Sequence, residues 1–251
     1  MSAALTAGGT QATKTYVRAE RFFFSGMALI ILAIVFLGFA RSYYLAGLFH
    51  APLPNLLVHV HGAAFSSWIL LLVIQTCLVA SGRVRLHKRL GLVSFGLAGL
   101  MLIVGLWAAT NSMIRHWAPG QTGIDVRAFY AVPVAAMGGF GTLTFFGFRE
   151  RRRNPPAHKR LMLIATVALL DAAFGRWPIL ASWWNLRTAQ LCCYLLLLFL
   201  VCYDLWLFRR LQRSTVLGSA LVVVLQQTAY LVGHSAFWQS FAAWASRASA
   251  F

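Results

Sequence analysis

Histidine is the residue of this sequence with the broadest chemistry, because a neutral imidazole can bind a metal or a haem iron and can exchange a proton near neutral pH. The stretch LLVHVHGAAF places His59 and His61 in an otherwise apolar segment. On a helix these side chains would point about 200° apart, so only one of them can face a bundle interior. We expect that one to be His61, because Trp68 and Gln75 follow it at steps of seven residues. Gly62 leaves room there for a flat ligand or for another helix.

Another histidine shares a predicted helix face with polar residues near the C-terminus. Gln227, Tyr230 and His234 are spaced i, i+3 and i+7, which places them on one side of a helix. Counted inward from the ends of their predicted helices, His61 and His234 differ in depth by only about 5 Å. Two imidazoles at one depth could bind a metal ion or both faces of a haem iron.

His87 and His158 form a second candidate ligand pair. Each begins the sequence HKRL where a basic loop leads into an apolar run, so their predicted depths match. The alternative for this pair is that basic residues at a helix end meet lipid phosphate and water. For each of the four candidate histidines, a hydrogen-bonded structural role is a further alternative.

Asp171 is a carboxylic acid predicted near the middle of a membrane, about 20 Å into its apolar segment. Arg176 follows it, nearer the outer boundary. A carboxylate at that depth needs a cation or a hydrogen-bond donor, and it could serve as a proton or substrate relay. The alternative is a buried pair or a bond between helices. Together with Gln75, Gln227 and Tyr230 these residues could form a polar binding site.

The composition identifies the medium in which these residues act. The chain has 251 residues, of which 60% are hydrophobic and 11% are charged, whereas a soluble domain has about 25% charged residues. We therefore predict an all-α, polytopic membrane protein. A charged group at mid-helix costs about 2.5–3.5 kcal/mol on insertion, so the few polar groups are expected to gather inside the bundle.

Seven apolar runs reach the length of about 20 residues that a membrane crossing needs. They predict a transmembrane domain over residues 22–244, preceded by a polar tail over residues 1–21. The predicted spans are about 22–45, 55–81, 89–113, 128–148, 158–182, 188–208 and 215–243.

The basic residues predict the orientation. Lysine and arginine cluster in the tail and in the loops after the second, fourth and sixth spans, which the positive-inside rule places in the cytoplasm. The N-terminus is then cytoplasmic and the C-terminus outside. The tail lacks the layout of a cleaved signal, so we expect the first span to direct insertion. The net charge of +17 comes from these loops and not from one polar face, which argues against nucleic-acid binding.

Several chemistries are excluded by the residues present. The three lysines, Lys14, Lys88 and Lys159, all lie outside the seventh span, where a retinal protein needs its Schiff base. The chain has no HExxH and no GxSxG motif. Its five acidic residues leave little for a divalent-cation carboxylate site.

Two segments carry a resemblance to known proteins. HVHGAAFSSWILLLVIQTCLVASGRVRLHKRLG (59–91) and NPPAHKRLMLIATVALLDAAFGRWP resemble signatures of an uncharacterised family of bacterial multi-pass membrane proteins. This likeness implies a bacterial inner-membrane location. Histidines near both membrane faces are also similar to those of the two-haem cytochrome b oxidoreductases, which would extend to His61, His87 and His158 but not to His234.

Two classes of function follow as hypotheses. The first is a redox or electron-transfer protein that lies in the lipid bilayer and binds haem b or a metal through histidine. Its partner would be a membrane protein or a quinone. The second is a transporter or small-molecule-binding protein that uses Asp171 and Arg176. A structural or assembly subunit of a membrane complex is the third possibility, and whether the chain is an enzyme stays open.

Overall fold

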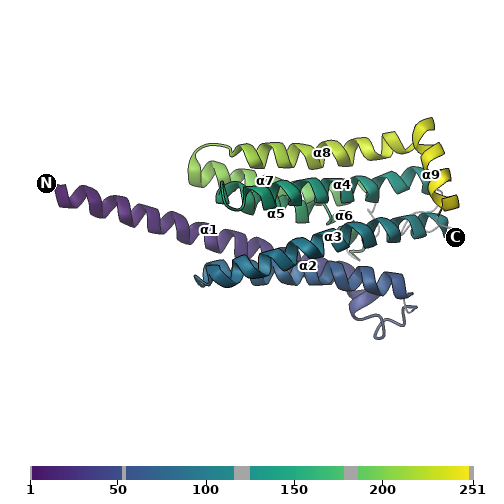
Figure 1. Ribbon diagram of the computed structural model, residues 1–251, viewed down its shortest axis with the longest axis horizontal. Coiled ribbons are helices and arrows are strands. Elements are labelled where there is room, and N and C mark those ends of the chain that lie inside the picture. The colour runs from purple at the N-terminus through teal and green to yellow at the C-terminus, as the bar shows by residue number, and fades with distance from the viewer. Residues whose placement is uncertain (1, 53–54, 116–124, 178–185, 249–251) are drawn as a thin grey trace.

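A computed structural model of the chain describes residues 2–52, 55–115, 125–177 and 186–248, and every regular element in these ranges is a helix (Figure 1). The long helices are α1 Ser2–Phe39, α2 Leu56–Ala80, α3 Val84–Ile114, α4 Val126–Glu150, α7 Leu186–Phe208 and α8 Arg213–Gly233. The short elements are the π-helical turn η1 Ala40–Tyr44, α5 Pro155–Val167, α6 Asp171–Phe174 and α9 Ala236–Ala248. The tail predicted over residues 1–21 belongs largely to α1.

Six helices in the described part of the chain are long and apolar enough to cross a membrane. Their outward faces carry large exposed hydrophobic side chains, among them Phe22, Leu191, Leu195 and Trp206. Helices satisfy their own backbone hydrogen bonds, so they can place such a surface in lipid. This architecture is compatible with a multi-pass membrane protein, the class that the composition predicts. The spans are Arg18–Tyr44, Leu56–Ala80, Val84–Ile114, Val126–Glu150, Arg187–Phe208 and Arg213–Gly233.

The fifth predicted span, residues 158–182, is not one continuous helix. Asn154 caps the start of α5, and prolines fill its first helical positions. The helix ends after 13 residues, and tighter i to i−3 hydrogen bonds separate it from α6. Thirteen residues reach about 20 Å, short of a hydrocarbon core of about 30 Å. Residues 178–182 lie outside the described residues, so six candidate spans stand where the sequence predicts seven.

The seventh predicted span, residues 215–243, also divides. α8 ends at Gly233, and α9 turns across the end of the bundle (Figure 1). Ser235 starts the new helix, because its hydroxyl accepts a hydrogen bond from the Trp238 amide at 3.3 Å. His234 therefore lies at the corner between two helices and not in the interior of one.

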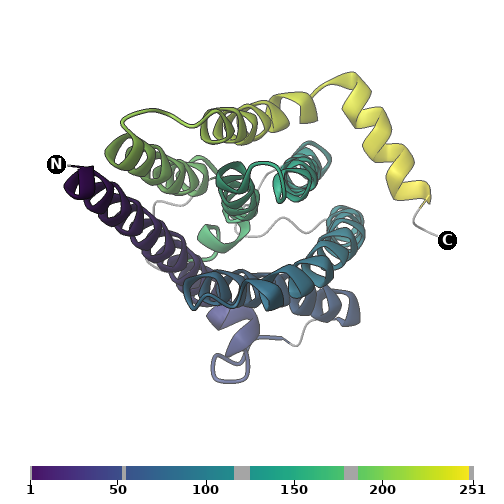
Figure 2. The ribbon, with the colours of Figure 1, turned by 60° about the vertical axis from the view of Figure 1, so that its left-hand side comes forward.

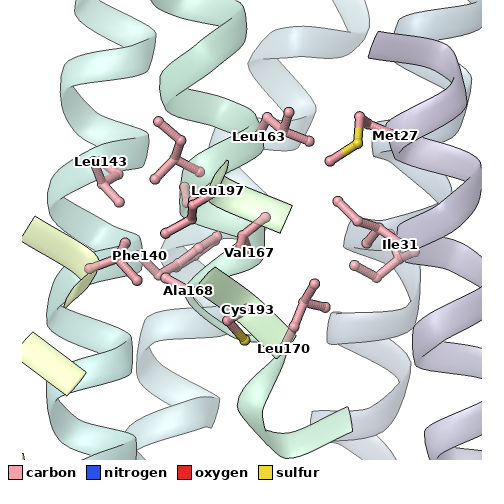
Figure 3. Packing of buried hydrophobic residues seen from close by; sticks show 14 of the residues in the cluster. Met27, Ile31, Phe140, Leu143, Leu163, Val167, Ala168, Leu170, Cys193 and Leu197 are labelled. Atoms are coloured by element: carbon pink, nitrogen blue, oxygen red, sulfur yellow. The ribbon is translucent and has the colours of Figure 1, made fainter. Parts of the chain in front are cut away.

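α5 lies at the centre of the bundle, between a layer of α1, α2 and α3 and a layer of α7 and α8 (Figure 2). Leu163 and Val167 of α5 lie between Ile31 of α1 and Phe140 of α4 (Figure 3), and each of the four is at most 3% exposed. The 13-residue helix α5 thus occupies a position shielded from the surroundings.

A buried ion pair fixes α5 against α7 and α8. Arg160 donates to Asp204 Oδ1 from Nε at 3.0 Å and from Nη2 at 2.5 Å. The Thr215 hydroxyl donates to Asp204 Oδ2 at 2.5 Å. All three residues are 0% exposed. This contact lies near the end of the bundle formed by the loops 81–83, 151–154 and 209–212, which we call the basic end because each loop contains arginine.

Candidate functional site

The structure brings His87 and His158 together near the basic end. Their ring centroids are 6.4 Å apart, and the planes of the two rings are inclined at 67°. α3 begins at Val84, after a turn in which Gly82 has a φ of 76°, so His87 lies in the first turn of the helix and not in the preceding loop. His158 occupies the first turn of α5, which the Asn154 cap and the prolines position. The shared HKRL sequence therefore marks two equivalent helix starts.

His158 has a defined tautomer. Its Nδ1 lies 2.7 Å from the carbonyl oxygen of Gly147 on α4. Because a carbonyl oxygen only accepts, Nδ1 must carry the proton, and Nε2 of the neutral ring keeps its lone pair. This arrangement, with one ring nitrogen held by a carbonyl and the other left as an acceptor, is the one that metal-ligating histidines adopt.

Gln75 of α2 contacts His87 Nδ1 through its side-chain amide. One end of its amide lies 2.6 Å from His87 Nδ1, and the other end lies 3.2 Å from the Ser94 hydroxyl. With the amide nitrogen toward His87, Nδ1 accepts and Nε2 carries the proton, and this orientation satisfies the backbone neighbours best. With the amide oxygen toward His87, Nδ1 donates and Nε2 becomes a second acceptor. The orientation of the Gln75 amide thus decides whether Nε2 of His87 carries the proton or offers a lone pair.

Positive charge surrounds this histidine pair. Lys88 lies beside His87, and Arg151 and Lys159 lie near His158. Lys159 is paired with Glu20 of α1 at 2.5 Å, and the Arg151 guanidinium lies 3.6 Å from the centre of the Phe148 ring. A ligand that carries carboxylates would find cations here.

His61 and His234 lie elsewhere and have separate neighbours. His61 is half-buried, stacks on Phe65 at 4.1 Å, and has an Nδ1 that is buried without a partner. His59 is exposed, in line with the predicted direction of the two rings. His234 is exposed and contacts Tyr230, one turn earlier on its own helix, at 4.6 Å. In the described part of the chain, no contact joins His61 to His234.

The space beside Gly62 is occupied by a side chain. A Cβ added there would lie 2.7 Å from Cζ of Tyr43, which comes from the π-helical turn η1. The sequence left two explanations for Gly62, a flat ligand or the close approach of another helix. The structure shows the close approach of a chain segment, and the Tyr43 ring fills the space that a ligand would need.

Asp171 starts α6 at the break in the central helix. It accepts hydrogen bonds from Cys193 Sγ at 3.1 Å and from Gln226 Nε2 at 2.7 Å. Gln226 is 6% exposed, and its Oε1 is buried without a partner. A cavity of about 10 Å³ next to Gln226 has room for about one water molecule. The carboxyl group therefore has two neutral donors, and the amide that holds it has a spare acceptor.

The other predicted polar residues lie around this carboxyl group or away from it. Gln227 donates to the Tyr194 hydroxyl at 2.7 Å, on the turn beside Gln226. Arg176 donates to the Ala172 carbonyl at 2.6 Å and lies over the Phe39 ring at 4.8 Å. Gln75 belongs to the histidine pair instead. From the sequence, Gln226 is a candidate cavity-lining residue together with Gln75 and Gln227, whereas the apolar run around Cys193 favours a packing role for it.

Metal ions are usually held by three or more side chains, and the described residues contain no group of three or more histidine, cysteine or acidic side chains that could hold one. The histidine pair near the basic end and the Asp171 cluster are therefore the two sites on which a function can be built. Comparisons of the chain with protein-family models, with curated proteins and with solved structures gave no match.

Proposed function

We propose that the chain is a membrane electron-transfer protein in which His87 and His158 would hold a haem b iron. The observation that carries the proposal is the separation of the two rings, 6.4 Å between centroids. Two rings this close could both contact one iron, because a metal–imidazole nitrogen bond is about 2 Å long.

The donor set favours haem over a free ion. A porphyrin supplies four nitrogens, so a haem iron asks the protein for only two ligands. His158 already offers Nε2 as an acceptor, because its Nδ1 proton is held by Gly147. His87 offers the same once the Gln75 amide presents its oxygen to Nδ1, with the amide nitrogen then on Ser94 at 3.2 Å. The cations beside the pair suit the two carboxylates of haem b.

A bound haem would supply reversible one-electron chemistry, and this chain would hold the iron and set its surroundings. Gly147 and Gln75 would orient the two imidazoles, and an Nδ1–H that donates to the Gly147 carbonyl or to the Gln75 amide oxygen would raise the basicity of the ligand. The exchange partner would be a quinone or another membrane protein that reaches the basic end. We place this end on the cytoplasmic side of a bacterial inner membrane, with the α5–α6 segment as part of a seventh crossing, on the strength of its arginine-rich loops.

Absorption spectroscopy of the purified full-length protein tests the ligand pair. We expect a Soret band and a reducible alpha band that are lost in both His87→Ala and His158→Ala. His59→Ala, at an exposed position, is the matched control and should keep the full spectrum. Full absorbance in both ligand variants would refute this pair, and loss confined to His61→Ala and His234→Ala would favour the other one.

A second candidate function rests on the break between α5 and α6. Interrupted membrane helices in transporters place polar groups and free backbone ends at mid-membrane, where substrate and ions bind. Asp171 lies at such a break, and Gln226 offers an unpartnered oxygen beside it. Here the protein would carry a proton or a small cation through the Asp171 cluster.

Flux through proteoliposomes tests this second candidate. A proton leak or cation-coupled pH change, followed with an internal dye, should fall to the level of empty vesicles in Asp171→Asn. Asp125→Asn is the matched control, because Asp125 is exposed and caps α4, a role that asparagine also fills. Equal flux in all three proteins would remove Asp171 from any transport role.

A further inference from the structure

We propose that a cavity at the basic end binds a phosphate group. The cavity has a volume of about 380 Å³ and lies where α5 and α8 begin, within the size range of about 300–1,000 Å³ typical of small-molecule sites. Its lining includes Asn154 at the start of α5 and the segment from Arg210 to Ser214 that leads into α8. Neither the histidine pair nor the Asp171 cluster contributes to it, so this site is independent of the proposed haem function.

The lining has the chemistry of an anion site. Arg210 and Arg213 supply two guanidinium groups, and no acidic residue lines the cavity. Both arginines are exposed, so their charged ends are available to a ligand. Guanidinium groups match phosphate with paired, charge-assisted hydrogen bonds. Ser214 adds a hydroxyl donor at the same wall.

The backbone adds donors on the α8 side only. Gln212 precedes α8 without making a side-chain cap, so the amides of the lining residues Arg213 and Ser214 have no capping side chain, whereas the Thr215 amide already donates to the Gln212 carbonyl at 3.0 Å. On the α5 side the first two helical residues are prolines, and the Ala157 amide already donates to Asn154 at 3.2 Å. A phosphate would therefore bind to the two arginines and to the start of α8, with α5 acting as the opposite wall.

The two walls are held together before any ligand arrives. Asp204 of α7 accepts hydrogen bonds from Arg160 of α5 and from Thr215 of α8, one residue from the cavity lining on the α8 side. Arg160 also donates to the Pro156 carbonyl at 2.9 Å, directly beside the lining residue Ala157. Because Arg160, Asp204 and Thr215 are fully buried, the spacing of the walls does not depend on the ligand, and binding loses little to ordering of the site.

Native mass spectrometry of the full-length protein in detergent tests the proposal with three probes: short-chain phosphatidylglycerol, short-chain diacylglycerol without a headgroup phosphate, and inorganic phosphate. We expect phosphatidylglycerol to bind at least about tenfold more tightly than diacylglycerol. Arg210→Gln combined with Arg213→Gln should remove this preference. Arg152→Gln combined with Arg153→Gln removes the same charge from exposed positions outside the lining and should leave it intact.

The outcomes separate the possible sources of the phosphate. Competition by inorganic phosphate at millimolar concentration would identify a soluble phosphate or phosphate ester, and its absence would identify a lipid headgroup; both support the site. Equal loss in the two double variants would show that the general positive field binds the probe, and would overturn the proposal. Retained preference in the Arg210 and Arg213 variant would overturn it as well. An unchanged melting temperature of each variant excludes loss of fold as the cause.

Discussion

Replacing Asp204 by alanine should strongly destabilise the helix bundle, although Asp204 belongs to neither candidate site. The substitution removes the nearer counter-charge of the Arg160 guanidinium, which is 0% exposed, and leaves it only the Glu20 carboxylate, whose Oε1 lies 3.8 Å from Nη1. Removing one partner of a buried ion pair costs about 3–5 kcal/mol. The Thr215 hydroxyl also loses its acceptor, which adds about 1 kcal/mol. Because Glu20 keeps part of the compensation, we expect the free energy of unfolding to fall by about 3 kcal/mol, the lower end of the range for a buried pair.

Unfolding of the purified protein in mixed micelles, followed by circular dichroism, measures this change. The second variant, Arg160→Met combined with Asp204→Leu, removes both charges and should recover much of the lost stability, because no unpaired charge remains. Asp125→Asn, at an exposed cap, should lie within about 0.5 kcal/mol of the parent. A loss below about 1 kcal/mol in Asp204→Ala, or a double variant as unstable as the sum of its single changes, would refute the buried-pair argument.

Three further predictions concern other parts of the chain. Gly38→Ala should lower the melting temperature, because the added Cβ would meet the backbone carbonyl of Ala173, whereas Gly26→Ala, with open space at that position, should not. Gln75→Leu should weaken haem binding by about 10–100-fold, measured by haem titration, because His87 loses the group that orients its ring; an unchanged affinity would remove Gln75 from the site. Reporter fusions should place the N-terminus in the cytoplasm and the C-terminus outside, and reporters on the same side would refute seven crossings.

The sequence was sufficient for the all-helical membrane architecture because long apolar runs have few alternatives. Helices α2, α4 and α7 begin and end close to the spans predicted for them. The division of the fifth span was not foreseen, since the residues 168–170 at the break are themselves apolar and carry no proline or glycine. The corner at His234 likewise has only Gly233 and Ser235 as its signal, and both residue types are common inside membrane helices.

Whether two residues belong to one site depends on their depth along the helix axis as much as on the helix face that they share. His61 and Gln75 share a stripe of α2, but fourteen residues separate them, about 21 Å along the axis. They therefore belong to opposite ends of the bundle, and Gln75 joins His87 instead. The pairing of His87 with His158 could be predicted, because identical sequences at two helix starts fix the same depth. The bond between Asp204 and Arg160 joins residues 44 positions apart, and no local pattern reveals such a contact.

The position of α5 explains why a helix of this composition can exist in the molecule. His158 and Arg160 are two residues apart, so they point to opposite sides of the helix: one to Gly147 of α4, the other to Asp204 of α7. A helix with polar groups on opposite sides has no apolar face to offer to lipid, and hydropathy alone ranks it below its neighbours. Surrounded by protein, it needs no such face. The same placement lets one short helix position His158 for the proposed haem site, form a wall of the phosphate cavity, and end at the break where Asp171 lies.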